Sequence, residues 1–259
     1  MNWENYLYPE NEKPLDTLVE GYSNTAIFRT IAFVGDSMSS GEFEACDENG
    51  QHGFYDMFEY SWGQHIARKN GLKGYSFSGG GMTAKNFMEG RAVFRGCWDK
   101  DKACQAYVIA LGVNDLIAQN MEVGSIEDID PENYKNNKPT FAGYYAAIIA
   151  KYKEISPDAK FFRVTFPEIH LDWHNEKALE HAAVLYALAD YYDNCYVIDL
   201  YKYAPKYDER FNEHFFMYGH MNPMGYIFTA KIIDSYIDYI IRHNPKDFEN
   251  VGFINKFRY

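Results

Sequence analysis

The stretch TIAFVGDS, residues 30–37, joins a short apolar run to a Gly-Asp-Ser turn. Residues 30–34 are mostly β-branched or apolar, which predicts a buried strand. The Gly-Asp pair that follows permits a sharp turn and sets Ser37 immediately past the strand. The stretch therefore predicts a strand whose carboxyl end carries a hydroxyl group.

Four more apolar runs bounded by turn residues follow along the chain, at residues 74–78, 106–111, 161–166 and 195–200. Segments of helical periodicity lie between and after these runs, at residues 55–69, 141–155, 176–192 and 225–243. Asn222 and Pro223 are typical of the N-cap and first position of the last helix. Strands that alternate with helices predict a parallel, doubly wound sheet. Ligands of such sheets bind beyond the carboxyl ends of the strands.

The composition fits one large α/β domain. The chain has 259 residues, 47% of them hydrophobic and 24% charged. We expect a single domain over residues 1–259, with an N-terminal extension at about 1–28 and a C-terminal arm at about 244–259. Two polar segments dotted with glycine and asparagine, residues 38–57 and 117–140, are interpreted as long loops at the functional edge of the sheet.

Charge and cysteine content exclude several classes of partner. With 25 basic and 37 acidic residues the net charge is -12, which disfavours binding to nucleic acid or to an anionic membrane. The four cysteines lack the spacing of a zinc site or a disulfide scaffold.

The first thirty residues lack the basic start and apolar run of a signal peptide, so we expect a cytoplasmic protein. The number of subunits stays open.

Two more strand ends carry groups suited to acyl transfer. The second strand leads into SGGGMT, residues 78–83, where successive glycines bring backbone N–H groups close to a ligand. The third leads into LGVNDL, which places the amide of Asn114 at the same edge. A serine that attacks an ester carbonyl puts negative charge on the oxygen, and each fixed donor lowers the barrier by ~3 kcal/mol. His220, in the loop before the final helix, could supply the base.

The order Gly-Asp-Ser, Gly, Gly-x-Asn-Asp and His, between Gly35 and Gly225, resembles the SGNH or GDSL-type hydrolase family. The resemblance implies a flavodoxin-like three-layer α/β/α sandwich with a five-stranded parallel sheet in the order 2-1-3-4-5. It also implies an esterase, lipase or carbohydrate deacylase that needs no metal or cofactor. By this resemblance Ser37 is the nucleophile and His220 the base. The oxyanion hole is implied to consist of the Ser37 N–H, the Gly81 N–H and the Asn114 side chain, with Gly79 or Gly80 as alternatives to Gly81.

One position departs from the family pattern. The family usually has an aspartate three residues before the histidine, where this chain has Met217. Three accounts compete: a Ser-His dyad whose Nδ1 proton is held by a backbone carbonyl, an acid from elsewhere, or a degenerate site that binds without turnover. The candidate acids are Asp208, Glu209 and Glu213. We expect the dyad, because catalysis survives at a reduced level when the acid is lost.

The expected function is a serine esterase that removes a short acyl group, with O-acetylated carbohydrates among the candidate substrates. The alternatives are a ligand-binding protein on the same scaffold and an acyltransferase. Asp36 and Asp115 are expected to brace turns beside the site. His170, Asp172 and His174 are interpreted as lining the substrate cleft or bonding to backbone, and not as metal ligands. Trp62, Trp98 and Trp173 are candidates for stacking on a sugar ring or an acyl chain, although most aromatic residues are expected in the core. His52 is expected to be a solvated loop residue.

Overall fold

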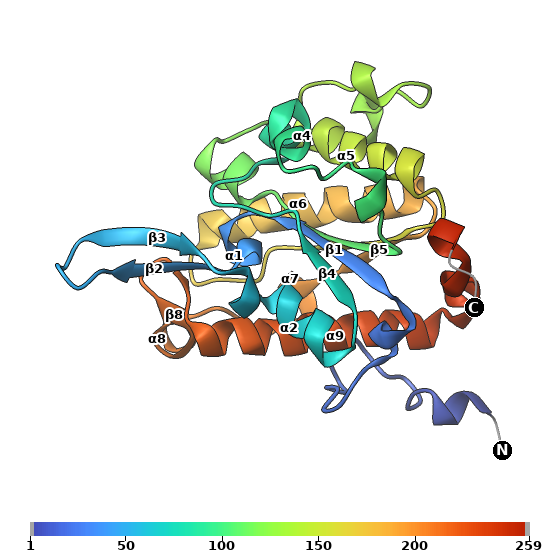
Figure 1. The fold of residues 1–259 in the computed structure, drawn as a ribbon, viewed down its shortest axis with the longest axis horizontal. Helices are drawn as coiled ribbons and strands as arrows, with labels where there is room; N and C mark the ends of the chain where they lie inside the picture. Colours follow the sequence, from blue (N-terminus) through green and yellow to red (C-terminus); the bar gives the residue numbers. More distant parts are fainter. Residues whose placement is uncertain (1–2, 257–259) are drawn as a thin grey trace.

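The computed structural model describes residues 3–256, and its centre is a five-stranded parallel sheet (Figure 1). The strands are β1 (Thr30–Gly35), β4 (Lys73–Ser76), β5 (Ala106–Ala110), β6 (Lys160–Val164) and β7 (Cys195–Ile198). Their spatial order is β4-β1-β5-β6-β7, which is the expected 2-1-3-4-5 when these five strands are counted along the chain. The predicted strands differ from these bounds by about two residues or fewer, the usual uncertainty of element ends.

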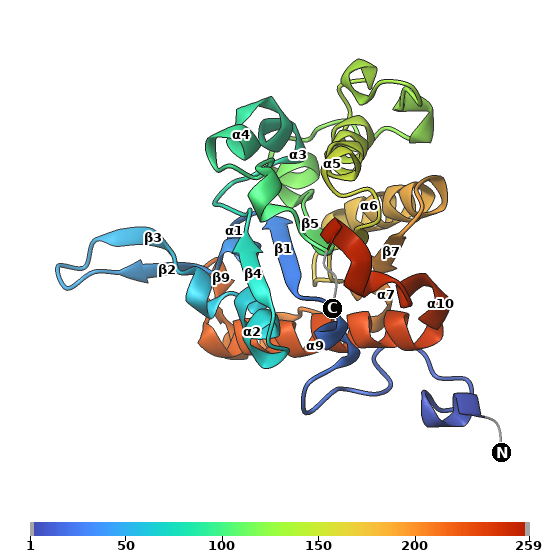
Figure 2. The same ribbon diagram turned by 45° about the vertical axis from the view of Figure 1, so that its right-hand side comes forward.

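Helices cover both faces of the sheet and create two apolar cores (Figures 1 and 2). The helices α2 (Trp62–Lys69) and α9 (Pro223–His243) lie on one face, and α5 (Phe141–Ile155) and α6 (Asp172–Tyr191) lie on the other. Successive residues of β5 alternate between the cores, because strand side chains point to opposite faces. Val108 packs into the core under α9, and Tyr107 and Ile109 pack into the core under α5. The three-layer sandwich is confirmed.

Local capping explains where the helices start. The Asn222 side chain accepts a hydrogen bond from the Gly225 N–H at 2.9 Å, and Pro223 is the first helical residue, so the predicted start of α9 is confirmed. The shorter helices are α1 (Ser37–Ser40), α3 (Ala84–Asn86), α4 (Ala92–Phe94), α7 (Leu200–Tyr203), α8 (Glu209–Phe215) and α10 (Pro245–Phe248).

The first polar segment is a β-hairpin, so its prediction as a loop was wrong. Strands β2 (Glu42–Cys46) and β3 (His52–Asp56) pair antiparallel, and the hairpin projects from the body beside the carboxyl end of β1 (Figures 1 and 2). The helix predicted from residue 55 begins only at Trp62. Tyr55 is taken into the hairpin opposite Phe43, and the Ser61 side chain caps α2 by accepting from the Gln64 N–H at 3.1 Å.

The remaining segments are short or irregular. A second two-stranded ribbon, β8 (Phe216–Met217) and β9 (His220–Met221), precedes α9. The segment 117–140 holds two 3-10 turns, Ile126–Asp128 and Tyr134–Asn136. The expected C-terminal arm contributes three buried apolar side chains, Phe248, Val251 and Ile254. Residues 1–2 and 257–259 of the two terminal segments lie outside the described residues. No helix within residues 3–256 is long and apolar enough to span a bilayer.

Candidate active site

Ser37 is the first residue of α1, directly beyond the carboxyl end of β1. The carboxyl of Asp36 caps this helix by accepting from the Met38 N–H at 3.0 Å, which fixes the turn that presents Ser37. As the first residue of a helix, Ser37 has a backbone N–H that no intrahelical carbonyl can satisfy. The serine hydroxyl and this N–H therefore stand together at the sheet edge where the sequence places the nucleophile.

His220 lies on β9, and its inner ring nitrogen faces a carboxylate. Nδ1 lies 3.0 Å from Oε2 of Glu44, which also accepts from the Gly219 N–H at 2.7 Å. These hydrogen bonds, chiefly the one from His220, hold the pKa of Glu44 below its ordinary value, so the group is a carboxylate at neutral pH. A carboxylate at Nδ1 favours the tautomer with the proton on Nδ1 and leaves Nε2 as the acceptor.

Glu44 replaces the partner that we expected for the imidazole. The oxygen at Nδ1 is a carboxylate from β2 and not a backbone carbonyl, so the dyad account was wrong. None of the candidate acids that follow the fifth strand takes this place: Asp208 caps α8 through the Phe211 N–H, and Glu209 and Glu213 are exposed. Met217 sits opposite His220 in the β8–β9 pair. The orienting acid thus comes from the hairpin inserted after β1.

A second carboxylate from β2 touches the outer nitrogen of the same ring. Oε1 of Glu42 lies 3.2 Å from Nε2 of His220, and a Cβ built on Gly80 would come within 2.5 Å of Oε2 of Glu42. Burial, the largest cause, raises the pKa of Glu42 against the lowering effect of His220. Glu42 therefore stands between the imidazole and the glycine loop, in the space where a reacting carbonyl would sit.

Not every backbone N–H group in the glycine loop after β4 is available to bind the oxygen of a substrate. Gly79 donates its N–H to the Gly35 carbonyl at 3.1 Å, which removes it from the candidates. The N–H groups of Gly80 and Gly81 have no hydrogen-bond partner among the described residues, and Gly81 has a φ of 62°. The Asn114 amide donates to the carbonyl of Met82 at 3.2 Å, so Asn114 adjoins this loop.

Asp36 and Asp115 brace turns, as predicted. Asp115 accepts from the Ala84 N–H at 2.9 Å and so ties the loop after β5 to the loop after β4. Burial raises the pKa of Asp36 to about 7 and that of Asp115 to about 6. The two carboxyls lie beneath the site and repel each other when both are charged.

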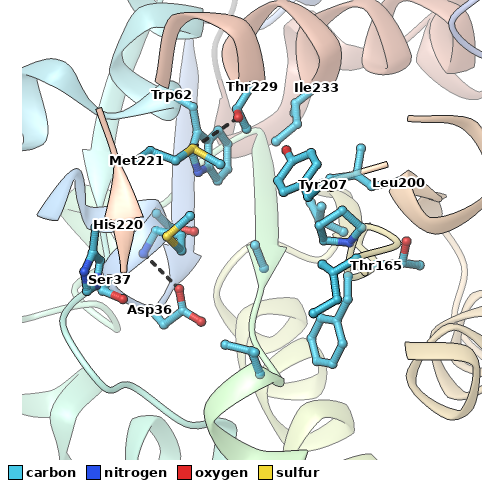
Figure 3. Close-up of a pocket in the computed structure, with 18 of the residues that line it drawn as sticks. Asp36, Ser37, Trp62, Thr165, Leu200, Tyr207, His220, Met221, Thr229 and Ile233 are labelled. Atoms are coloured by element: carbon cyan, nitrogen blue, oxygen red, sulfur yellow. Dashed lines mark hydrogen bonds between the residues drawn. The ribbon is translucent and has the colours of Figure 1, made fainter. Parts of the chain in front are cut away.

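A cavity of about 400 Å³ opens between Ser37 and the first turns of α9. Figure 3 shows Ser37 and His220 at one end and Leu200, Tyr207 and Ile233 toward the other. Trp62 and His174 also line it, while Trp98 packs in the core against Phe87 and Tyr152. His170, Asp172 and Trp173 are exposed. No cluster of three or more potential metal ligands occurs in residues 3–256.

The sequence interpretation placed His52 in a loop and did not identify Glu42 or Glu44 as residues of the site. His52 lies on strand β3 and not in a loop, but its side chain is solvent-exposed as expected, and its Nε2 lies 2.9 Å from Oε1 of Glu44. The signal for the glutamates is the alternation Glu42, Phe43, Glu44. In a strand this pattern sends both acids to one face and the aromatic ring to the other, where Phe43 is buried.

A model of the GDSL-like lipase/acylhydrolase family matches residues 33–227, which include the carboxyl end of β1, the hairpin and His220. The chain belongs to this family. No curated protein matches it.

Solved structures share the fold of this family member at low identity. A family two carbohydrate esterase from Clostridium thermocellum, in complex with cellohexaose, is 17% identical with a TM-score of 0.56; the match covers 91% of this chain and 66% of that one. A Clostridium thermocellum family 3 carbohydrate esterase is 14% identical with a TM-score of 0.54, over 83% and 98% of the chains. A Corynascus thermopiles family 2 carbohydrate esterase with a carbohydrate binding domain is 14% identical with a TM-score of 0.55, over 82% and 66%.

Proposed function

We propose that the protein hydrolyses carboxylic esters through an acyl intermediate on Ser37. The single observation that carries the proposal is the arrangement of His220, which lines the same cavity as Ser37 and has the Glu44 carboxylate at Nδ1. Once substrate has displaced Glu42 from Nε2, this arrangement leaves Nε2 able to accept a proton, as a general base must. Membership of an acylhydrolase family supports the same reaction class.

The steps follow from the groups present. Nε2 of His220 takes the hydroxyl proton while Ser37 Oγ bonds to the ester carbonyl carbon, and negative charge moves to the carbonyl oxygen. The N–H groups of Ser37 and Gly81 and the Asn114 amide are proposed to bind that oxygen. His220 then gives its proton to the leaving alkoxide as the C–O bond breaks. His220 then deprotonates a water molecule as its oxygen bonds to the acyl carbon, and it returns this proton to Ser37 Oγ as the acyl–Oγ bond breaks, which releases the acid and the free serine.

Glu44 acts through His220 and not on the substrate. Its negative charge stabilises the imidazolium that forms in each half-reaction, and its hydrogen bond keeps the ring in one orientation. In this proposal Glu44 takes the role that the family usually gives to the aspartate three residues before the histidine.

A carbohydrate is the proposed alcohol half of the ester. Neighbours of the same fold include carbohydrate esterases, one of them in complex with cellohexaose. The rings of Phe54 and Tyr218, both more than half exposed, stand over the His220 side of the site, where Phe54 contacts the imidazole edge at 5.7 Å between ring centroids. Exposed aromatic faces of this kind can stack on sugar rings.

Hydrolysis of p-nitrophenyl acetate tests the proposal. We expect turnover in the unmodified protein and loss of about 1000-fold or more in both Ser37→Ala and His220→Ala. His170→Ala changes an exposed histidine away from the cavity and serves as the matched control. Activity that survives in Ser37→Ala would refute the acyl-serine route. Addition of a sugar or simple alcohol separates hydrolysis from acyl transfer, because a transferase would form the new ester in preference to the free acid.

A further inference from the structure

The cavity at Ser37 is much larger than an acetyl group requires. Its volume is about 400 Å³, whereas one water molecule, about the size of a methylene group, takes up ~30 Å³. An acetyl group attached to Ser37 would therefore fill only the entrance. The remaining space runs under α9, where the buried side chains of Val164, Leu200 and Ile233 line it.

The polar side chains along this cavity are already paired or neutral. The Thr165 hydroxyl donates to the Asp199 carboxylate at 3.1 Å, and the Thr229 hydroxyl donates to the Met221 sulfur at 3.3 Å. His174 Nδ1 has no hydrogen-bond partner among the described residues, and burial lowers the pKa of this imidazole, so the ring is uncharged at neutral pH. Among the residues that line the cavity, Asp36 is the only Asp, Glu, Lys or Arg, and it lies beside Ser37, so the rest of the cavity suits a hydrocarbon chain.

The position of His220 decides which half of an ester can enter. The imidazole must give its proton to the leaving oxygen, so the alcohol half departs on the His220 side of Ser37, next to the hairpin. Leu200, Tyr207 and Ile233 lie at the end of the cavity away from His220 (Figure 3). Only the acyl half, bonded to Ser37, can extend in that direction.

On the basis of the proposed function, we propose that this cavity binds the acyl chain and that the enzyme prefers medium-length acyl esters, of about six to ten carbons. Each methylene that enters an apolar cavity raises kcat/KM by about 2- to 4-fold. Octanoyl has six more methylenes than acetyl, so kcat/KM is expected to rise by at least ~60-fold between these two esters and to fall once the chain is too long for the cavity.

A chain-length series tests this assignment. The kcat/KM of p-nitrophenyl esters from acetyl to tetradecanoyl is measured for the unmodified protein, for Ile233→Phe and for Leu200→Phe. Both substitutions fill the cavity from different elements, α9 and α7, so one remains informative if the other fails to fold. Ile227→Phe is the matched control, because Ile227 is 45% exposed on α9 and does not line the cavity. We expect the octanoyl-to-acetyl ratio to fall about 10-fold or more in the filling variants and to stay unchanged in the control.

A direct binding measurement separates this inference from the proposed chemistry. Octanoate is expected to raise the melting temperature of the Ser37→Ala protein, and this shift should vanish in Ser37→Ala combined with Ile233→Phe. Rates that fall steadily from acetyl onward, with no octanoate shift, would overturn the acyl cavity while leaving Ser37-dependent acetyl hydrolysis intact. An octanoate shift without any Ser37-dependent hydrolysis would support the cavity and overturn the proposed function.

Discussion

His220 lies between two carboxylates that belong to one strand. Glu44 meets Nδ1 at 3.0 Å and Glu42 meets Nε2 at 3.2 Å. The two contacts have opposite consequences for a general base. A carboxylate at Nδ1 prepares the ring to accept a proton at Nε2, whereas a carboxylate at Nε2 occupies the position that the Ser37 hydroxyl needs in the proposed mechanism. In the proposed mechanism, substrate must therefore displace Glu42 from Nε2 before Ser37 can be deprotonated.

Glu44→Gln is expected to lower kcat by about 100-fold or more, because a neutral amide no longer stabilises the imidazolium and can hold the wrong tautomer. Steady-state kinetics with p-nitrophenyl acetate measure kcat and KM separately, and KM should change little. Glu48→Gln, at the exposed tip of the same hairpin, is the control. A kcat of Glu44→Gln within about threefold of the unmodified protein would contradict the role of Glu44 and return the site to a dyad.

Glu42→Ala is expected to raise kcat/KM for p-nitrophenyl acetate several-fold, because Nε2 of His220 becomes free for the Ser37 hydroxyl. Steady-state kinetics measure kcat/KM, with Glu48→Ala at the exposed tip of the hairpin as control. If kcat/KM stays unchanged or falls, Glu42 does not obstruct Nε2 in solution.

At the scale of elements, the hairpin controls which groups reach the site. Glu42 and Glu44 share one face of β2 because they are two residues apart, and Phe43 between them is buried against Tyr60 and Tyr226. The partner strand adds His52, which contacts the other oxygen of Glu44 at 2.9 Å. Register within the hairpin therefore determines whether a carboxylate or an aromatic ring faces His220.

An insertion of one alanine after Phe43 is expected to reduce kcat/KM about as much as loss of Glu44, because a slip by one residue turns the following side chains to the other face. The same alanine inserted between Glu48 and Asn49 lies in the turn and should have little effect. Circular dichroism checks that both proteins keep the α/β fold. Equal activity of the two insertion variants would show that the hairpin register does not govern the site.

The sequence predicted correctly those elements whose residues form a clear apolar pattern over a short stretch of chain. The five sheet strands carry buried apolar runs, and Ser37 and Asn114 follow strand ends, where parallel sheets place their ligands. The hairpin was missed because five charged residues and two glycines between residues 42 and 56 resemble a solvated loop more than a strand pair. The alternation Glu42, Phe43, Glu44 indicates a strand with both acids on one face, but the partner of Glu44 could be identified only from the structure, since His220 is 176 residues further along the chain.

At the scale of the whole molecule, the buried carboxyl groups of Asp36 and Asp115 make the free energy of unfolding depend on pH. The pKa of Asp36 is raised by burial from 3.8 to about 7. The folded protein therefore keeps a proton that the unfolded chain has lost, and the resulting stabilisation is complete below pH 3.8 and disappears as the pH rises through about 7. Asp115, with a pKa raised to about 6, acts in the same direction.

Asp36→Asn is expected to stabilise the protein at pH 8 and to leave its stability at pH 4 nearly unchanged. Asparagine keeps the helix cap and cannot ionise. The variant therefore avoids the free-energy cost of ionising the buried Asp36 carboxyl, which is at most about 4 kcal/mol. Urea unfolding across this pH range measures the difference, with Asp158→Asn on the surface as control. If the difference in free energy of unfolding between Asp36→Asn and the unmodified protein is the same at pH 4 and pH 8, Asp36 does not titrate as described.

The two carboxylates and the proposed nucleophile are encoded within eight consecutive residues, from Ser37 to Glu44. One continuous segment, the short helix α1 and the start of β2, thus delivers both the proposed attacking group and the groups that contact the imidazole, whereas His220 comes from a distant part of the chain. A transplant of this segment together with the β8–β9 ribbon into a related scaffold would carry a complete proton-handling unit, whereas exchange of the ribbon alone would separate the imidazole from both of its acids.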